Sequence, residues 1–464
     1  MIRFFNTLSG KIEPFKPITP AEVKLYTCGP TVYDYAHIGN FRAYVFEDLL
    51  KRFLIYKGYR VIHVMNITDV DDKTIKGAHA EGVNLSQYTQ KFIEAFFEDI
   101  DRLNIARAEH YPRATEHIQE MVKIIKGLLK KGFAYKKDGS VYFSISRFPT
   151  YGALSNIKPE ELRPGERIEA DEYEKESIQD FALWKEKKEG EPFWETEVGP
   201  GRPGWHIECS AMSMKYLGPT FDIHCGGVDN IFPHHENEIA QSEAYTGKKF
   251  VNYWLHLHHL IVEGEKMSKS KGNQYTLRDL MDKNVDPLDL RLLLLSTHYR
   301  KMLNFTFEAL GQAHASRQRL IDFLYELSHR KLSEGENQKV KNLVDETEFK
   351  FIAGLANDLN ISLSLSALFE MVRKANVLLA EDKVAKKDAQ RLLSLVRSLD
   401  RILAVLPPEK EEKLPPRIMK KIEEREKARR QKRYDEADRI REELLKMGII
   451  LEDTPEGVRW KIKR

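Results

Sequence analysis

Two cysteines, a histidine and a glutamate offer the ligands of a metal site, although they lie far apart in the sequence. Cys28 ends an apolar, strand-like run, and Cys209 follows closely on Trp205. His234 and Glu238 are four residues apart, a spacing that puts both on one face of a helix. Two thiolates, one imidazole and one carboxylate make a tetrahedral zinc set. Because zinc prefers sulfur, such a site would also accept a thiol substrate as a further ligand.

The spacing of these four residues alone leaves a simpler interpretation open. The two cysteines lack the Cys-x-x-Cys spacing that is typical of zinc sites. An intracellular cysteine is most often a small buried apolar residue, and a His/Glu pair at this spacing often lies on a solvated helix face. The neighbouring motifs favour the metal site.

The first of these motifs is suited to phosphate. Residues 23–27 predict a buried strand, and a Gly-Pro turn and then His37-Ile38-Gly39-Asn40 lead into a helix expected over residues 41–56. The free N–H groups and the dipole of such a helix N-terminus favour phosphate. Gly39 would let a nucleotide approach the backbone closely. His37 would donate to the phosphates, or would only cap the helix.

A lysine-rich loop supplies the complementary charge. Residues 265–273 read Glu-Lys-Met-Ser-Lys-Ser-Lys-Gly-Asn and follow the apolar run 260–262. Lys266 and Lys269 suit a polyphosphate whose negative charge grows as the leaving group departs. Taken by itself, this segment is equally compatible with an ordinary solvated loop.

The two motifs, more than two hundred residues apart, resemble the two signatures of class I aminoacyl-tRNA synthetases. The chain resembles the cysteinyl-tRNA synthetase family over essentially its whole length. The supporting blocks are residues 28–34, 66–73, 201–212, 221–229 and 232–240, in the family's order. One residue departs from the pattern, because Asn40 stands where the first signature usually ends in His. Asn also donates a hydrogen bond but cannot become cationic.

The resemblance implies an ATP-dependent ligation of L-cysteine to tRNA(Cys) through cysteinyl-adenylate. It implies one zinc ion per chain, which would select the cysteine thiolate, and Mg²⁺ bound with ATP. The implied zinc ligands are Cys28, Cys209, His234 and Glu238. The implied ATP contacts are His37, Gly39, Asn40, Gly226, Gly227, Asp229, Lys266 and Lys269, of which His37, Lys266 and Lys269 are also catalytic. The implied cysteine contacts are Cys28, Gly29, Thr68, Trp205 and His224.

The expected fold is α/β, with a doubly wound parallel sheet of the Rossmann type split by an insertion. Strand-like runs at 23–27, 60–67, 221–224 and 251–254, with helical spacing between them, predict the sheet. An α-helical bundle and a small C-terminal domain should follow. The expected domains are 1–113 and 201–296 for the two catalytic halves, 114–200 for an irregular connective insertion, 297–406 for a stem-contact region and helical bundle, and 415–464 for an anticodon-binding domain.

Charge and composition agree with a nucleic-acid partner. Residues 415–464 hold 16 lysines and arginines against 11 acidic residues, a balance of +5, whereas the whole chain carries +3. A basic segment on a nearly neutral body favours a polyanion, with affinity that falls as salt rises. Many Lys/Arg/Glu-rich helices are, however, only solvated faces.

The location of the protein also follows from its composition. No apolar run approaches about 18 residues, which excludes a membrane span, and the first residues lack the apolar stretch of a signal peptide. The chain has three cysteines, which argues against a disulfide framework and for a reducing compartment. We therefore expect a cytoplasmic protein, and by the family resemblance a monomer. Cys225, expected in a loop of the site, should be an ordinary free thiol.

Two rival functions remain at this point. One is a related ligase that joins cysteine to an amino sugar; it would lack an anticodon module, and the basic C-terminal segment argues against it. The other is a non-catalytic tRNA-binding paralogue, against which the complete set of lysine, histidine and metal-ligand candidates argues.

Overall fold

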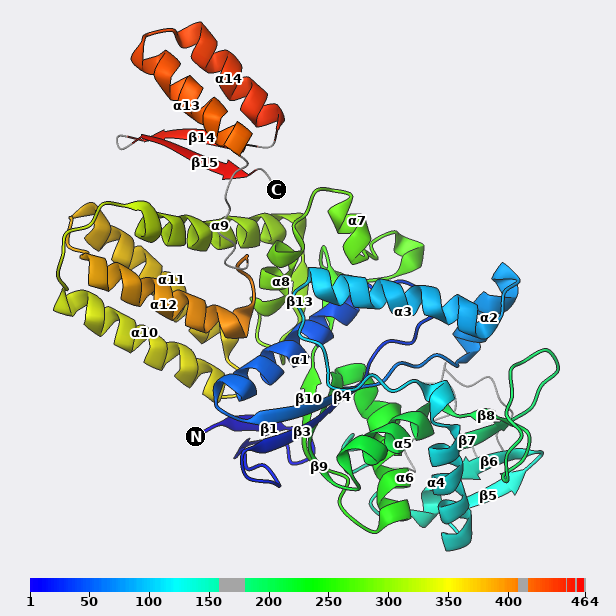
Figure 1. The fold of residues 1–464 in the computed structure, drawn as a ribbon. Coiled ribbons are helices and arrows are strands. Elements are labelled where there is room, and N and C mark those ends of the chain that lie inside the picture. Colours follow the sequence, from blue (N-terminus) through cyan, green and yellow to red (C-terminus); the bar gives the residue numbers. More distant parts are fainter. Residues whose placement is uncertain (158–179, 408–415, 448, 455–456, 463–464) are drawn as a thin grey trace. The chain divides into compact units, whose positions relative to one another are not determined.

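The computed structural model describes the chain except for residues 158–179, 408–415, 448, 455–456 and 463–464 (Figure 1). The chain forms two compact units, Met1–Leu406 and Pro407–Arg464. Each unit is described by itself. Among the described residues, no helix is both long enough and apolar enough to cross a bilayer.

A four-stranded parallel sheet lies at the centre of the first unit. Its strands are β3 (Glu22–Thr27), β4 (Arg60–Met65), β9 (Phe221–Gly227) and β10 (Val251–Leu257), in the order β10-β9-β3-β4. The four strands expected from the sequence are confirmed. The chain moves from β3 outward to β4 on one side and from β9 outward to β10 on the other. The switch point therefore lies between β3 and β9, and in sheets of this kind ligands bind outside the carboxyl ends of the strands at that point.

Helices cover both faces of this sheet. Val23 and Leu25 of β3 share one apolar core with α1 (Ile38–Tyr56), which connects β3 to β4. Tyr26 points to the other core, which contains α5 (Trp205–Leu217) and α6 (Glu236–Thr246). Alternate residues of a strand face opposite sides, so β3 is buried on both faces, as a parallel strand requires. The doubly wound fold is confirmed.

Helix α1 begins three residues earlier than expected. His37 Nδ1 accepts a hydrogen bond from Asn40 N at 3.2 Å, and Asn40 Oδ1 accepts one from His37 N at 3.0 Å. This reciprocal capping box satisfies two backbone donors and starts the helix at Ile38. The apolar residues from Phe41 onward indicate a helix but do not show that it begins at Ile38.

The segment between β4 and β9 is more regular than expected. After α2 (Asp72–Glu81) and α3 (Leu85–Arg102) come α4 (Ile118–Lys131) and an antiparallel sheet of β5 (Ala134–Lys137), β6 (Ser140–Phe143), β7 (Phe181–Glu186) and β8 (Gly201–Pro203) (Figure 1). The expectation of an irregular insertion was therefore wrong for the part that is described. Helix α4 buries an apolar stripe, and β6 is buried along its length. The proline and charge run at 159–176, which suggested irregularity, lies outside the described residues.

The remainder of the first unit is mostly helical, as expected. A hairpin of β1 (Arg3–Asn6) and β2 (Lys11–Pro14) precedes the large sheet, and a small sheet of β11 (Leu260–Val262), β12 (Glu265–Lys266) and β13 (Leu303–Phe305) carries the lysine loop. Helices α7 (Leu277–Met281) and α8 (Pro287–Leu295) follow that loop. The helical bundle consists of α9 (Phe307–His329), α10 (Gln338–Ala356), α11 (Ile361–Ala380) and α12 (Lys386–Leu403).

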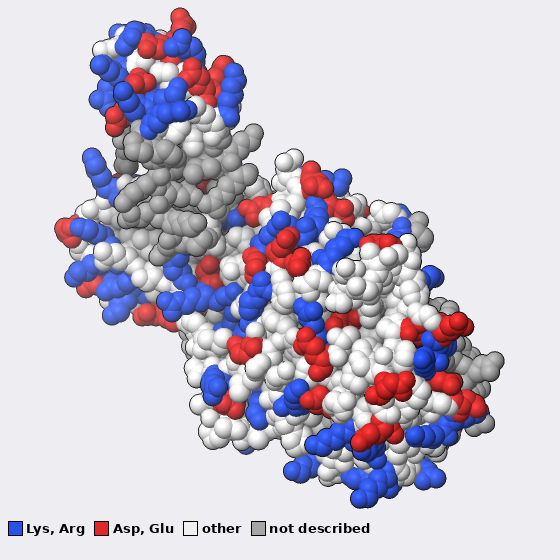
Figure 2. Space-filling model, turned by 45° about the vertical axis from the view of Figure 1, so that its right-hand side comes forward, with Lys and Arg blue, Asp and Glu red and all other residues white. Residues whose placement is uncertain are grey.

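The second unit is small. It contains helices α13 (Pro416–Arg430) and α14 (Tyr434–Lys446) and a hairpin of β14 (Ile449–Thr454) and β15 (Gly457–Ile462). Its core is a small aliphatic cluster of Ile422, Ile440, Leu444, Ile449 and Leu451. Figure 2 shows lysines and arginines crowded on the surface of this unit.

Candidate active site and metal centre

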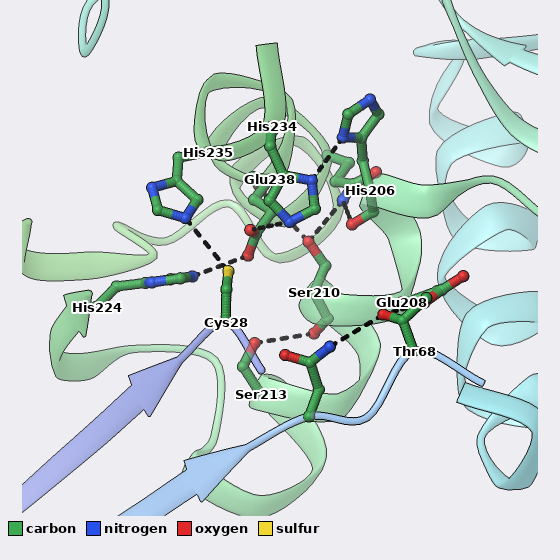
Figure 3. Close-up of polar contacts among 12 residues, drawn as sticks. Cys28, Thr68, His206, Glu208, Ser210, Ser213, His224, His234, His235 and Glu238 are labelled. Atoms are coloured by element: carbon green, nitrogen blue, oxygen red, sulfur yellow. Dashed lines mark hydrogen bonds and ion pairs between the residues drawn. The ribbon is translucent and has the colours of Figure 1, made fainter. Parts of the chain in front are cut away.

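Four side chains with metal-binding atoms converge at the carboxyl end of β3. Figure 3 shows three of them, Cys28, His234 and Glu238. Cys28 directly follows β3, Cys209 lies in α5, and Glu238 lies in the first turn of α6. His234 lies in the short π-helical turn Ile231–His235 that precedes α6. The four ligand atoms all lie within 4.8 Å of one another. The structure thus brings together the four residues proposed as zinc ligands.

Burial disfavours the charged forms of these four side chains when no cation is bound. Cys209, His234 and Glu238 are buried, and Cys28 is half-buried. The pKa of Cys28 is raised well above its usual value, first by the hydrogen bond with Cys209 and then by burial. The hydrogen bond with Cys28 lowers the pKa of Cys209, but burial and the nearby carboxylates of Glu238 and Glu208 together raise it above its usual value. Burial also raises the pKa of Glu238 to about 8 and lowers the pKa of His234 to about 3.

The residues fit a zinc ion. Glu238 Oε1 is buried and accepts no hydrogen bond, although His234 Nε2 lies 3.1 Å away. Two ligand atoms about 2.0–2.1 Å from a tetrahedral zinc lie roughly 3.3 Å apart, close to that separation. A metal cation would both satisfy the orphaned oxygen and stabilise the buried thiolates, which otherwise carry a large desolvation cost.

A second group of possible ligands shares two members with the first. Cys28, His224, His235 and Glu238 also lie within 4.8 Å of one another. His235 Nε2 is 3.4 Å from Cys28 Sγ, and His224 Nε2 is 3.1 Å from Glu238 Oε2. This group has one thiolate where the first has two, so the first suits zinc better. His235 was not expected at the site, because an ideal α-helix would turn it 100° away from His234, whereas the π-helical turn buries both.

Two neighbouring rings, those of His206 and Trp205, hold the candidate ligand His234 in place. His206 Nδ1 lies 2.9 Å from His234 Nδ1, which leaves Nε2 of His234 facing Glu238. The Trp205 ring stacks on His234 with a centroid distance of 4.0 Å. Contacts of this kind fix the tautomer and orientation of a metal-binding histidine.

The proposed cysteine contacts surround the same cluster. A Cβ at Gly29 would lie 1.8 Å from Asn66 O, so only glycine fits beside the end of β4. Thr68 Oγ1 donates to Glu208 Oε2 at 3.1 Å and accepts from Asn66 Nδ2 at 3.2 Å. His224 is fully buried on β9. Asn66 and Glu208 escaped the sequence analysis as site residues, although both belong to the blocks that it singled out.

The two phosphate-binding motifs also meet. Ile38 N donates to Tyr275 O at 2.9 Å, and a Cβ at Gly39 would lie 2.9 Å from Met267 Cε. The lysine loop therefore packs directly against the N-terminus of α1. Lys269 Nζ contacts the carboxylate of Asp34, while Lys266 is exposed on β12.

His37 caps the helix through Nδ1 and keeps an N–H donor at Nε2. Because Nδ1 accepts from Asn40 N, the ring proton lies on Nε2 and can be donated. Burial lowers the pKa of His37, whereas the nearby carboxylates of Asp34 and Asp229 raise it and Lys269 lowers it. The charges of Asp34, Asp229 and Lys269 therefore all influence the protonation of the residue that caps α1.

The glycines proposed for ATP binding end strand β9. A Cβ at Gly226 would lie 2.6 Å from His235 Cε1, and a Cβ at Gly227 would lie 2.2 Å from Asp229 Oδ1. Asp229 is exposed in the 3-10 turn Val228–Asn230. Cys225 lies inside β9 and is fully buried, so its expected position in a loop was wrong. The strand runs three residues beyond its expected end at 224, because Cys225, Gly226 and Gly227 also pair with β10.

Three family models match the chain. The "tRNA synthetases class I (C) catalytic domain" family matches residues 14–315, the "DALR domain" family matches 350–407, and the "Cysteinyl-tRNA ligase anticodon binding domain" family matches 411–460. Among solved structures, methionyl-tRNA synthetase from Mycobacterium tuberculosis in complex with methionyl-adenylate aligns with a TM-score of 0.61. That alignment covers 83% of this chain and 90% of that one at 15% identity, which shows the fold alone.

The fold and the converging signatures define a class I aminoacyl-tRNA synthetase. Cysteine–tRNA ligases from Brachyspira hyodysenteriae and Protochlamydia amoebophila are 51% and 49% identical to the chain. The alignments cover 100% and 99% of this chain, and 99% and 98% of those proteins. The chain belongs to the cysteine–tRNA ligase family.

Proposed function

We propose that the protein ligates L-cysteine to tRNA(Cys) in two steps that use ATP. The observation that carries this proposal is a cluster of two thiols, an imidazole and a carboxyl at the end of β3, the strand from which the chain leads into the N-terminus of α1. The cluster suits the thiol of cysteine, and the helix N-terminus with its lysine loop suits ATP.

In the first step, the cysteine carboxylate attacks the α-phosphate of ATP in line and pyrophosphate leaves. The chain's part is to position the reactants and stabilise charge, as in phosphoryl transfer generally. His37 Nε2 would donate to the phosphates, and the positive end of the α1 dipole would attract them. Lys266 and Lys269, with Mg²⁺ on the nucleotide, would stabilise the departing pyrophosphate.

The other ATP contacts have separate tasks. Asn40 caps α1 and thereby orients its N–H groups, and Gly39 keeps the backbone accessible. Gly226 and Gly227 would leave room for the nucleoside at the end of β9. The exposed carboxylate of Asp229 would accept hydrogen bonds from ribose hydroxyls.

Cysteine would be selected by its sulfur. Cys28, Cys209, His234 and Glu238 would hold one zinc ion, which supplies a ligand position for the substrate thiolate. Gly29, Thr68, Trp205 and His224 would hold the rest of the amino acid. A hydroxyl is a poorer zinc ligand than a thiolate and a methyl group is none, so discrimination should exceed the roughly 10²-fold of a shape-only pocket.

In the second step, the terminal ribose hydroxyl of tRNA attacks the activated carbonyl. We assign residues 1–113 and 201–296 to the catalytic domain, 114–200 to its connective insertion, 297–406 to the stem-contact region and helical bundle, and 415–464 to anticodon binding. The unit boundary after Leu406 and the anticodon-domain match at 411–460 support the last assignment. We further propose that the protein acts as a monomer in the cytoplasm.

The test is ATP–pyrophosphate exchange with each amino acid, followed by charging of total tRNA. Exchange should depend on cysteine, and the charged product should be Cys-tRNA(Cys). Cysteine-dependent exchange without any charging of tRNA would favour a small-molecule acceptor such as an amino sugar. Binding of tRNA without exchange would favour a non-catalytic paralogue.

Truncation after Leu406 should separate the two steps. Val405 and Leu406 are buried in the first unit, and both donate backbone N–H groups to Asp400, so the cut spares them. The shortened protein should make cysteinyl-adenylate at a near-normal rate, because every proposed zinc, ATP and cysteine contact lies before the cut.

Charging of tRNA(Cys) by the truncated protein should fall sharply, because the basic second unit is missing. RNA binding by the full chain should show the steeper salt dependence. Equal charging by both forms would mean that the second unit does not contribute to tRNA recognition.

A further inference from the structure

Lys269 of the lysine loop makes an ion pair that the proposed reaction does not use. Its Nζ contacts Oδ2 of Asp34, which lies in the loop between β3 and α1. We propose that Asp34 is a positioning residue that competes with the phosphates of ATP for Lys269, so that nucleotide binding exchanges one anionic partner for another. This inference rests on the proposed role of Lys269 in ATP activation.

Asp34 is a fixed partner, because both of its neighbours are anchored. Tyr33 O accepts a hydrogen bond from Tyr88 on α3 at 2.7 Å. The Tyr35 ring packs edge-on against Phe92 at 5.4 Å and lies 5.1 Å from the guanidinium of Arg278. The carboxylate between these two tyrosines therefore has little freedom to follow the lysine loop.

Internal contacts help to hold the lysine loop, in addition to the packing of Met267 against the N-terminus of α1. Ser268 N donates to Asn273 Oδ1 at 2.8 Å, and Lys271 Nζ lies 2.8 Å from Glu265 Oε2. The Lys269–Asp34 pair crosses from this loop to the anchored segment. Breaking that pair would free Lys269 without dismantling the loop.

The pair lies beside the phosphate-binding helix N-terminus. A cavity of about 220 Å³ there is lined by Asp34, Tyr35, Lys269, Gly272, Gln274, Thr276 and Asp279. Asp34 raises the pKa of His37 and Lys269 lowers it, so both charges act at the N-cap of α1. A polyphosphate bound at that N-cap would attract Lys269. It would repel the carboxylate of Asp34, which pairs with Lys269.

The expected size of the effect is modest. The Lys269 side chain is 66% exposed and that of Asp34 is 32% exposed. Exposed ion pairs shift equilibria by about 1.4–5-fold, the equivalent of roughly 0.2–1 kcal/mol. Asp34 would therefore tune the affinity for ATP and would not decide whether ATP binds.

The test is Asp34→Asn in the full-length protein, measured by cysteine-dependent pyrophosphate exchange. The KM for ATP should fall about 2–5-fold, with a much smaller change in kcat, and the difference should shrink at high salt. Glu265→Gln is the matched control, because it removes the exposed Glu265–Lys271 pair of the same loop. It should leave the KM for ATP unchanged.

A double-mutant cycle separates competition for Lys269 from simple repulsion of ATP. In a Lys269→Ala background, Asp34→Asn should no longer improve ATP binding, measured directly with a non-hydrolysable ATP analogue. A second readout is tryptic cleavage after Lys269, identified by mass spectrometry. Asp34→Asn should accelerate this cleavage, and the saturating analogue should remove the difference.

An unchanged or increased KM in Asp34→Asn would overturn the proposal, as would an equal decrease in Glu265→Gln. So would improved ATP binding that persists in the Lys269→Ala background. Failure of the proposed function would look different, since the unmodified protein would then show no cysteine-dependent exchange.

Discussion

Replacing Cys209 with alanine should remove zinc from the protein and abolish cysteine activation. Cys209 is 1% exposed and supplies one of the two sulfur ligands of the cluster, and the third cysteine, Cys225, belongs to neither group of candidate ligands. Metal analysis of freshly purified protein should give one zinc per chain before the change and none after it. Pyrophosphate exchange should fall to background.

Cys225→Ala is the matched control for this change. Cys225 is equally buried, on β9, but belongs to neither group of candidate ligands. It should keep both zinc and activity, and circular dichroism of both variants separates a lost fold from a lost site. Zinc that stays in Cys209→Ala, or full cysteine activation in zinc-free protein, would contradict the ligand assignment.

Lys269→Ala should lower cysteine-dependent pyrophosphate exchange by about 10²–10³-fold, the scale of losing one preorganised charge-stabilising contact. The loss should fall on kcat, with little change in cysteine binding, because Lys269 acts on charge that develops as pyrophosphate leaves. Steady-state kinetics of the exchange at varied ATP and cysteine measure both effects.

Lys271→Ala is the control for the lysine loop. Lys271 carries the same charge two residues further along, but it pairs with Glu265. Its replacement should change the exchange rate by much less. A Lys269→Ala protein that lost cysteine affinity while keeping turnover would show that the loop has another task.

Much of the catalytic fold followed from the sequence because its strands are buried on both faces. Such strands are nearly continuous apolar runs in the sequence. Residues whose side chains can bind ligands follow directly after them. Cys28, Thr68 and His224 were therefore expected together at the carboxyl ends of the strands. The pairing of Thr27 with both Met65 and Cys225 shows that alignment.

Other features depend on three-dimensional geometry that the spacing of residues in the sequence does not reveal. The capping box of His37 and Asn40 set the start of α1, and the π-helical turn before α6 buried His235 beside His234. Glu208 was missed because its role arises from a contact with Thr68 across 140 positions of sequence. The antiparallel sheet of the insertion was missed because a proline- and charge-rich stretch separates β6 from β7.

The central claim is that the protein selects cysteine through sulfur coordination at zinc. Zinc K-edge X-ray absorption of the purified protein, with and without substrate, tests it most directly. The account predicts two sulfur ligands per zinc in the protein alone, three after addition of cysteine, and no change with serine or alanine. Two sulfur ligands in the presence of saturating cysteine would contradict it.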